Sequence, residues 1–137
     1  MLVQYGAIPI RRGDDEGIQV LLVTSRETRR WVVPRGNPVR GLDPPQSAAQ
    51  EAYEEAGVRG SIGPAPLGSY RYGKRKPTGA FLPAEVHLYP LEVEETLEDW
   101  PERAERERRW FEPYAAADAV DEPELKALLR GLAESRG

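Results

Sequence analysis

The chain has 137 residues, of which 39% are hydrophobic and 31% charged, and its formal net charge is −4 at pH 7. This composition indicates a globular protein with one domain over residues 1–137, and the acidic balance argues against a general nucleic-acid-binding protein, which is usually basic. The absence of cysteine excludes disulfide bonds, thiolate chemistry and cysteine-ligated zinc.

The N-terminal part of the chain predicts three strands. Residues 3–10 and 18–24 are rich in apolar residues, and a polar turn at 12–17 separates them. A short strand at 31–33 follows and is stopped by Pro34. No basic segment precedes the first apolar run, and no run approaches the roughly 20 residues that span a bilayer. We therefore expect no signal peptide, no membrane partner and a cytoplasmic location.

A helix is the next predicted element, after a loop at residues 37–43. Asp43 is a favourable N-cap, and two prolines follow it at the first helical positions, where they are tolerated. The helix runs to about Ala56, and Gly57 is placed to end it. Small residues on one face are expected to let the helix lie close against a sheet: Ala48, Ala49, Ala52 and Ala56.

Three carboxylates share another face of this helix. Glu51, Glu54 and Glu55 lie three and four residues apart, so their side chains are neighbours. Like charges at this spacing destabilise a helix, and the helix contains no Lys or Arg to offset them. One reading is a solvated acidic surface. The other is a site for a hard cation such as Mg²⁺ or Mn²⁺, which prefers oxygen ligands.

The C-terminal half predicts further strands and two helices. Strands are expected at 68–72 and 85–94, with a basic loop at 73–79 after the first and an edge or bulge at Pro90. The remaining elements are a strand at 108–111 and helices at 113–120 and 122–132. This order predicts a mixed α/β or α+β sandwich with helices packed on a sheet.

Basic residues gather in two places on this acidic chain. One group precedes the predicted helix and the other lies in the basic loop: Arg26, Arg29, Arg30, Arg35 and Arg40, then Lys74, Arg75 and Lys76. Arginine can pair with two phosphate oxygens at once. A local basic patch on an acidic protein fits a compact polyanion better than a long duplex. The alternative is a solvated charged surface.

Residues 36–58 resemble the Nudix box, G-x5-E-x7-R-E-U-x-E-E-x-G-U, where U is apolar. Two positions differ, because Leu42 stands where the pattern has its first Glu and Gln50 where it has Arg. The segments LLVTSRETRRWVVPRG, LEVEETLEDW and RERRWF are similar to the diphosphoinositol polyphosphate phosphohydrolase branch of that family. The remaining box positions match without a gap: Gly36, Glu51, Ala52, Glu54, Glu55, Gly57 and Val58.

The resemblance implies an α/β/α sandwich around a mixed sheet and a metal-dependent hydrolase of phosphoanhydrides. Its metal ligands would be Glu51, Glu54 and Glu55, with Mg²⁺ (or Mn²⁺) as cofactor. The catalytic carboxylates are expected among Glu54, Glu55 and Glu95, with Glu55 or Glu95 as the base. The substrate is expected to be a diadenosine polyphosphate or a diphosphoinositol polyphosphate. Residues expected to bind it are Ser25, Arg26, Arg30, Arg35, Lys74, Arg75 and Lys76.

The two departures from the box remove a charge near the glutamates. Gln50 can donate a hydrogen bond to a carboxylate but is uncharged, and Leu42 makes no polar contact. Loss of such support reduces metal affinity or activity by about 10–100-fold. Three alternatives therefore stay open: a weakly active Nudix module that binds a phosphorylated ligand, an ADP-ribose-type pyrophosphatase, and an interaction domain without metal. We expect a small phosphorylated substrate, no stable nucleic-acid partner, and a monomer or homodimer.

Overall fold

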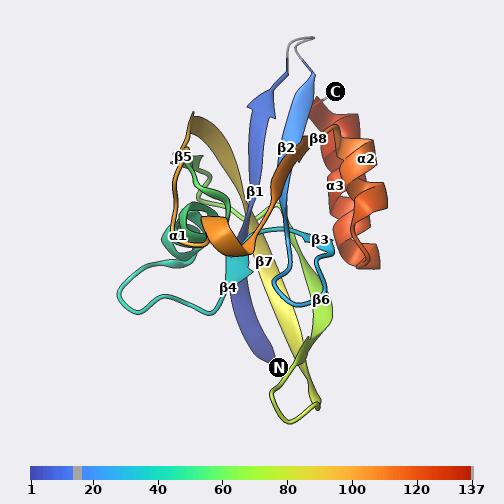
Figure 1. The fold of residues 1–137 in the computed structure, drawn as a ribbon. Coiled ribbons are helices and arrows are strands. Elements are labelled where there is room, and N and C mark those ends of the chain that lie inside the picture. Colours follow the sequence, from blue (N-terminus) through green and yellow to red (C-terminus); the bar gives the residue numbers. More distant parts are fainter. Residues whose placement is uncertain (14–16, 137) are drawn as a thin grey trace.

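A computed structural model describes residues 1–13 and 17–136 (Figure 1). One sheet forms its centre, with strand order β3-β2-β1-β7-β5, and β4, β6 and β8 pair with β1, β7 and β2. The strands are β1 Leu2–Arg12, β2 Ile18–Thr24, β3 Trp31–Val32, β4 Arg35–Gly36, β5 Val58–Ile62, β6 Gly68–Arg75, β7 Phe81–Thr96 and β8 Arg108–Phe111.

Helices cover the sheet on two sides. Helix α1 (Pro44–Ala56) packs on one face, while α2 (Pro113–Ala119) and α3 (Pro123–Arg136) pack together on the other (Figure 1). This arrangement confirms the predicted α/β/α sandwich around a mixed sheet, in which β1 and β7 are parallel and the other pairs antiparallel. No helix in the described part of the chain is long and apolar enough to cross a membrane.

The two layers have separate hydrophobic cores because successive strand residues point to opposite faces. In β2, Val20 and Leu22 pack toward α2 and α3, whereas Leu21 and Val23 pack toward α1. A strand buried on both faces reads as a continuous apolar run, which is the pattern at residues 20–23.

Strand β7 is central, so of the edge or bulge predicted at Pro90 the edge is wrong, and the register shift in its pairing lies instead between Arg59 and Gly60 of β5. It pairs with β1 on one side, and on the other side with β6 and then with β5. Pro90 lies between these two partners, after the pair Gly68–Leu88 and before the pair Ile62–Leu91. Its carbonyl accepts the Gly63 N–H at 2.8 Å. Pro90 has no N–H to return this bond, and the pairing of β7 changes from β6 to β5 at this position.

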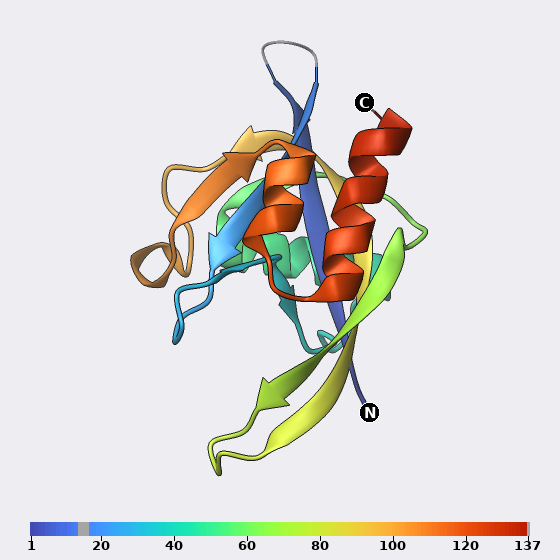
Figure 2. The same cartoon turned by 90° about the vertical axis from the view of Figure 1, so that its right-hand side faces the viewer.

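Other boundaries also need correction. Strand β5 was not predicted; its Gly60 lies against the backbone of Glu92, where no side chain fits. Strand β6 extends to Arg75 and β7 begins at Phe81, so the predicted basic loop at 73–79 is largely a hairpin. This hairpin projects beyond the sheet (Figure 2). Residues 14–16 of the turn predicted at 12–17 lie outside the described residues.

Candidate active site

Helix α1 begins and ends where the sequence predicts. The Asp43 carboxylate accepts a hydrogen bond from the Gln46 backbone N–H at 2.8 Å, and the Gln46 side chain accepts one from the Asp43 N–H at 3.1 Å. This reciprocal capping box fixes the first turn. Gly57 ends the helix with a φ of 66°, a left-handed conformation that glycine adopts without strain.

The buried face of α1 orients the glutamates. Ala48, Ala52 and Ala56 are fully buried against the sheet, as predicted. Ala49, which we expected on the same face, lies at its edge and is only partly buried. With the helix held in this rotation, Glu55 is 6% exposed, while Glu51 and Glu54 are partly buried.

The three glutamates contact one another and their surroundings. The carboxyl groups of Glu51 and Glu55 share a hydrogen bond. The Gln50 amide donates to Glu54 at 3.0 Å, so Gln50 supplies the bond, without the charge, that an arginine would supply there. Gly36 lies directly against the Glu51 carboxylate, where a Cβ atom would overlap it.

The electrostatics at Glu55 combine burial with competing charges. Burial raises the pKa of Glu55 to about 8; Arg106 opposes the shift, and the hydrogen bond with Glu51 and the charges of Glu51 and Glu102 add to it. Burial also raises the pKa of Glu51, and Glu54 and Glu102 contribute to that shift. Burial and the neighbouring carboxylates therefore favour the protonated form of Glu55, and a bound cation would oppose this shift.

Arg106 supplies a cation that the sequence did not predict. Its side chain is 8% exposed; Nη2 lies 3.8 Å from Glu55 Oε1, and Nε donates to Glu102 Oε1 at 2.7 Å. Nη1 donates to the Thr24 carbonyl at 3.0 Å, which fixes the guanidinium. The helix alone lacks a positive charge to offset its three glutamates. Arg106, from a loop distant in sequence, supplies part of that charge.

Glu102, and not Glu95, is the later carboxylate that lies near the glutamates of the Nudix box. The Glu102 N–H donates to the Glu54 carbonyl at 3.0 Å, and its charge acts on both Glu51 and Glu55. Glu95 instead pairs with Arg59 at 3.9 Å, where both side chains are 57% exposed. This pair lies on the β5–β7 ladder, and Glu95 does not line the pocket described below.

The loop after β7, taken together with Arg108 at the start of β8 and called here the loop at 97–108, closes the end of α1. Trp100 Nε1 donates to the Glu55 carbonyl at 3.1 Å, and Arg108 Nη1 donates to the carbonyls of Ala56 and Gly57 at 3.0 and 3.3 Å. These bonds, with the one from Glu102, satisfy carbonyls that the last helical turn leaves without intrahelical partners. One loop therefore holds the glutamate turn and also carries Arg106.

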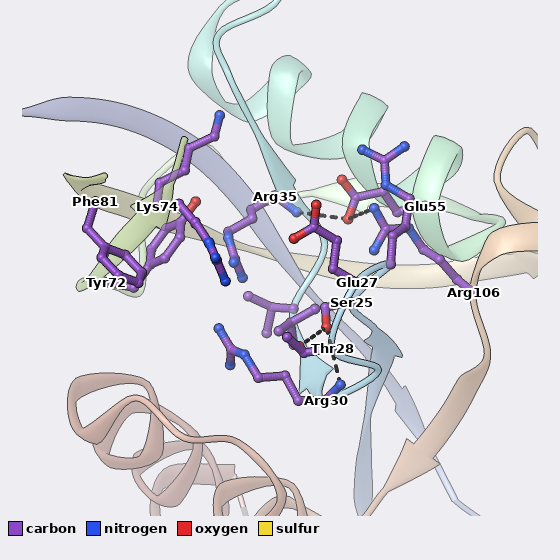
Figure 3. Close-up of a pocket in the computed structure, with 15 residues that line it drawn as sticks. Ser25, Glu27, Thr28, Arg30, Arg35, Glu55, Tyr72, Lys74, Phe81 and Arg106 are labelled. Atoms are coloured by element: carbon purple, nitrogen blue, oxygen red, sulfur yellow. Dashed lines mark hydrogen bonds and ion pairs between the residues drawn. The ribbon is translucent and has the colours of Figure 1, made fainter. Parts of the chain in front are cut away.

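A pocket of about 450 Å³ opens beside Glu55 (Figure 3). Glu55 and Arg106 lie at one end, Arg35 is central, and Tyr72, Lys74 and Phe81 lie at the other end. Its lining is mainly basic. It contains six cationic side chains, Arg26, Arg30, Arg35, Lys74, Arg75 and Arg106, and two carboxylates, Glu27 and Glu55.

Most of the predicted substrate-binding residues meet in this pocket. Ser25, Arg26, Arg30, Arg35, Lys74 and Arg75 line it, but Lys76 does not. Lys76 lies in the tight turn at 76–80, where its N–H donates to the Ala80 carbonyl at 2.8 Å. Which basic residues of a hairpin face inward depends on its pairing and turn, and neither can be deduced from a run of basic residues.

Ser25 organises the loop that carries two of these arginines. Its hydroxyl lies 2.6 Å from the Thr28 hydroxyl and accepts the Arg30 N–H at 3.2 Å. Arg29 adopts a positive φ of 59° in the same loop, and its side chain bonds the Glu105 carbonyl instead of facing the pocket.

Arg35 is held in the pocket by two tyrosines. Its guanidinium stacks 4.1 Å above the Tyr72 ring and donates to the Tyr70 hydroxyl at 3.1 Å. Burial alone would lower the pKa of Arg35, but Tyr70, Tyr72 and Glu122 outweigh it and raise the pKa above its usual value. Arg35 therefore stays charged. Its backbone N–H also donates to Glu55 Oε1 at 3.4 Å, which links the basic and acidic parts of the site.

The donor set fits a hard cation, although the side chains do not form a closed metal shell. Within residues 1–13 and 17–136, no three His, Cys, Asp or Glu side chains converge closely enough to hold a metal ion. Glu51 and Glu55 nevertheless place two carboxyl groups in contact in a largely buried position. Paired, desolvated oxygen donors of this kind suit Mg²⁺ or Mn²⁺.

The two box departures lie together on the other side of α1. Leu42 and Gln50 line a shallow groove of about 370 Å³ with Tyr53, Arg59 and other residues. Leu42 is 38% exposed and contributes only apolar surface there. Leu42 therefore does not line the pocket beside Glu55.

Sequence relatives identify the family. The NUDIX domain model matches residues 2–132. Nudix hydrolase 16, mitochondrial, of Arabidopsis thaliana is 33% identical over an alignment of 139 residues, which covers 92% of this chain and 77% of the relative. Diphosphoinositol polyphosphate phosphohydrolase 2 of Rattus norvegicus is 36% identical over 102 residues, covering 73% of this chain and 52% of the relative. The chain thus spans about half the length of that relative, and 48% of Nudix hydrolase 12, mitochondrial, of Arabidopsis thaliana.

Solved structures show the same fold. A C. elegans Ap4A hydrolase in a binary complex superposes with a TM-score of 0.71 at 22% identity, covering 98% of this chain and 96% of the other. The NUDIX domain of Shewanella oneidensis NrtR, solved with ADP ribose, gives a TM-score of 0.69 at 16% identity, covering 100% and 89%. At these identities the likeness concerns the fold alone. Together with the domain match, the sequence relatives confirm the predicted resemblance, and the chain belongs to the Nudix family.

Proposed function

We propose that the protein is a metal-dependent pyrophosphohydrolase that cleaves a phosphoanhydride bond in a small, highly phosphorylated substrate. The observation that carries this proposal is that Glu55, a buried carboxylate of the Nudix box, opens onto the same pocket as six cationic side chains. A diadenosine polyphosphate or a diphosphoinositol polyphosphate fits such a lining, and the name of a 36%-identical relative indicates the second class.

The chemistry requires cations around a phosphate chain and an activated water. Arg30 and Arg35 are placed to bind non-bridging phosphate oxygens, and Arg35 is rigid enough to fix their position. Glu51, Glu54 and Glu55 would hold Mg²⁺ (or Mn²⁺), which when bound stabilises charge on the phosphates and acidifies water. Negative charge that develops on the leaving oxygen would be stabilised by the cationic side chains of the pocket lining.

Glu55 is the best-placed proton acceptor among the predicted catalytic residues. It faces the pocket, and burial brings its pKa toward the working range of a general base. Glu54 is held by Gln50 and supports the metal site beside it. Glu95 lies outside the pocket lining, and Glu102 supports the site through the hydrogen bond that it accepts from Arg106.

A weakly active binding module is the second candidate. It is favoured by the absence of three converging metal ligands among the described residues and by the uncharged Gln50 next to Glu54. This candidate predicts tight binding of a phosphorylated ligand with little turnover. An ADP-ribose-type pyrophosphatase differs only in substrate, so the same assay separates it.

The test is a phosphate-release screen over diadenosine polyphosphates, diphosphoinositol polyphosphates and ADP-ribose, with Mg²⁺, Mn²⁺ or EDTA. We expect metal-dependent hydrolysis of at least one substrate and a loss of about 100-fold or more in Glu55→Gln, because an essential acid–base group contributes about 10²–10⁴-fold. Glu95→Gln is the matched control and should stay within twofold. Hydrolysis that is equal in Glu55→Gln and wild type would overturn the proposal. Calorimetric binding without hydrolysis would favour the module.

A further inference from the structure

Glu122 is a buried carboxylate that the proposed chemistry does not use. It directly precedes α3, is 6% exposed, and its carbonyl accepts the Lys126 N–H at 2.9 Å. Neither carboxylate oxygen has a hydrogen-bond partner of suitable geometry. Leu125 and Leu129 are fully buried in the same helix, so the start of α3 is anchored in the core.

The charged group nearest to Glu122 belongs to the pocket. Arg30 Nη2 lies 3.0 Å from Glu122 Oε2, and the Arg30 side chain also lines the pocket. Arg30 Nη1 is buried without a hydrogen-bond partner of its own. Glu122 also acts electrostatically on Arg35, the second arginine of the pocket floor. Glu122 itself is not among the residues that line the pocket, so it contacts Arg30 from outside the lining.

A buried carboxylate held by one ion pair of imperfect hydrogen-bond geometry contributes little to stability, because desolvation offsets what the pair returns. An apolar residue at this position would pack in the core without that cost. The ion pair with Arg30, whose side chain lines the pocket, points instead to a role in holding that side chain. Arg30 comes from an exposed loop, and its long side chain would otherwise sample many rotamers.

We infer that Glu122 is a positioning residue: from the start of α3 it fixes the Arg30 guanidinium on the pocket floor, ready to receive a phosphate group. This inference rests on the proposed function only in taking the pocket to bind phosphates. It concerns binding and not hydrolysis.

Two effects of Glu122 on an anion have opposite signs, which makes the inference testable. If Glu122 only neutralised positive charge, its removal would strengthen binding of an anion. If it orders Arg30, its removal adds the entropy cost of fixing one long side chain to each binding event. We expect the second effect to prevail and to weaken binding about fivefold, which corresponds to about 1 kcal/mol.

The experiment is calorimetric titration of the full chain with sodium tripolyphosphate in EDTA, so that metal binding does not enter. We expect about fivefold weaker binding in Glu122→Gln, a larger loss in Arg30→Gln, and no further loss in the double variant. Asp121→Asn makes the same charge change one residue away, at a carboxylate that is 74% exposed and 3.8 Å from Arg30. It should bind tripolyphosphate within twofold of wild type.

Equal or tighter binding by Glu122→Gln would overturn the inference, as would an equal loss in the Arg30→Gln background. Failure of the wild type to bind tripolyphosphate would also count against it. Thermal unfolding of each variant separates loss of fold from loss of binding. The proposed enzymatic function fails by a different result, the absence of metal-dependent hydrolysis, so the two outcomes are distinguishable.

Discussion

Replacing Glu55 with Gln tests the electrostatic description of the site most directly. The pKa of Glu55 lies at about 8 in the folded protein, compared with 4.5 for the free side chain. Because the folded state binds this proton more tightly, the stabilisation is complete below pH 4.5 and is lost as the pH rises through about 8. At about 1.4 kcal/mol per unit, the shift corresponds to an upper value of about 5 kcal/mol.

Glutamine at position 55 keeps the shape of the protonated carboxyl group and does not titrate. In EDTA, we therefore expect Glu55→Gln and wild type to be similarly stable at pH 5, and the variant to be more stable by about 2–5 kcal/mol at pH 8.5. The shared hydrogen bond with Glu51 explains the range, because Glu51 titrates in both proteins. Urea unfolding at half-unit pH intervals measures the difference.

Glu95→Gln is the matched control, because Glu95 is 57% exposed and lies away from the pocket. Its stability should follow the wild-type curve at every pH. A difference between Glu55→Gln and wild type that stays flat with pH, or that favours wild type at pH 8.5, would refute the reasoning. Addition of Mg²⁺ should stabilise wild type more at pH 8.5 than at pH 5, since ligand carboxylates must lose their protons.

Three further changes probe the neighbours of Glu55. Arg106→Gln removes the buried cation, so we expect a loss of about 3–5 kcal/mol in the free energy of unfolding at pH 8.5, measured in urea; a loss below 1 kcal/mol would contradict the pairing. Gly36→Ala places a methyl group against Glu51, so Mn²⁺ should bind about tenfold more weakly by calorimetry, while unchanged affinity would show that Glu51 is not a ligand. Gln50→Arg adds charge to the bond with Glu54 and should raise kcat/KM by up to about 10-fold, whereas a decrease would show that Gln50 suits this site as it stands.

The helix of the Nudix box could be predicted from the sequence because its signals are local. Asp43, the prolines after it and Gly57 mark its ends within one turn of the chain, and alanines mark its buried face. Strand β5 could not be found in this way. Its five residues include Gly60, and their strand conformation depends on pairing with partners in β7 that lie 29 to 38 residues later.

The site shows the same division between local and distant information. Glu51, Glu54 and Glu55 follow from helical spacing, and the arginines before the box follow from their proximity in sequence. Arg106 and Glu102 could not be placed, because only the path of the loop after β7 brings them to α1. Glu95 is equally acidic and closer in sequence, but alternation along β7 and pairing with Arg59 place it elsewhere.

The loop at 97–108 limits where residues can be inserted into this chain. Connections between strands ordinarily accept inserted residues, because few bonds depend on their backbone. Here, one added residue would shift Trp100, Glu102 or Arg108 out of reach of the carbonyls at the end of α1. The turn at 76–80 bonds only within itself, through Lys76, Gly79 and Ala80. Grafted tags and inserted segments therefore belong in that turn, whereas the loop at 97–108 should be transplanted between proteins only together with the helix that it closes.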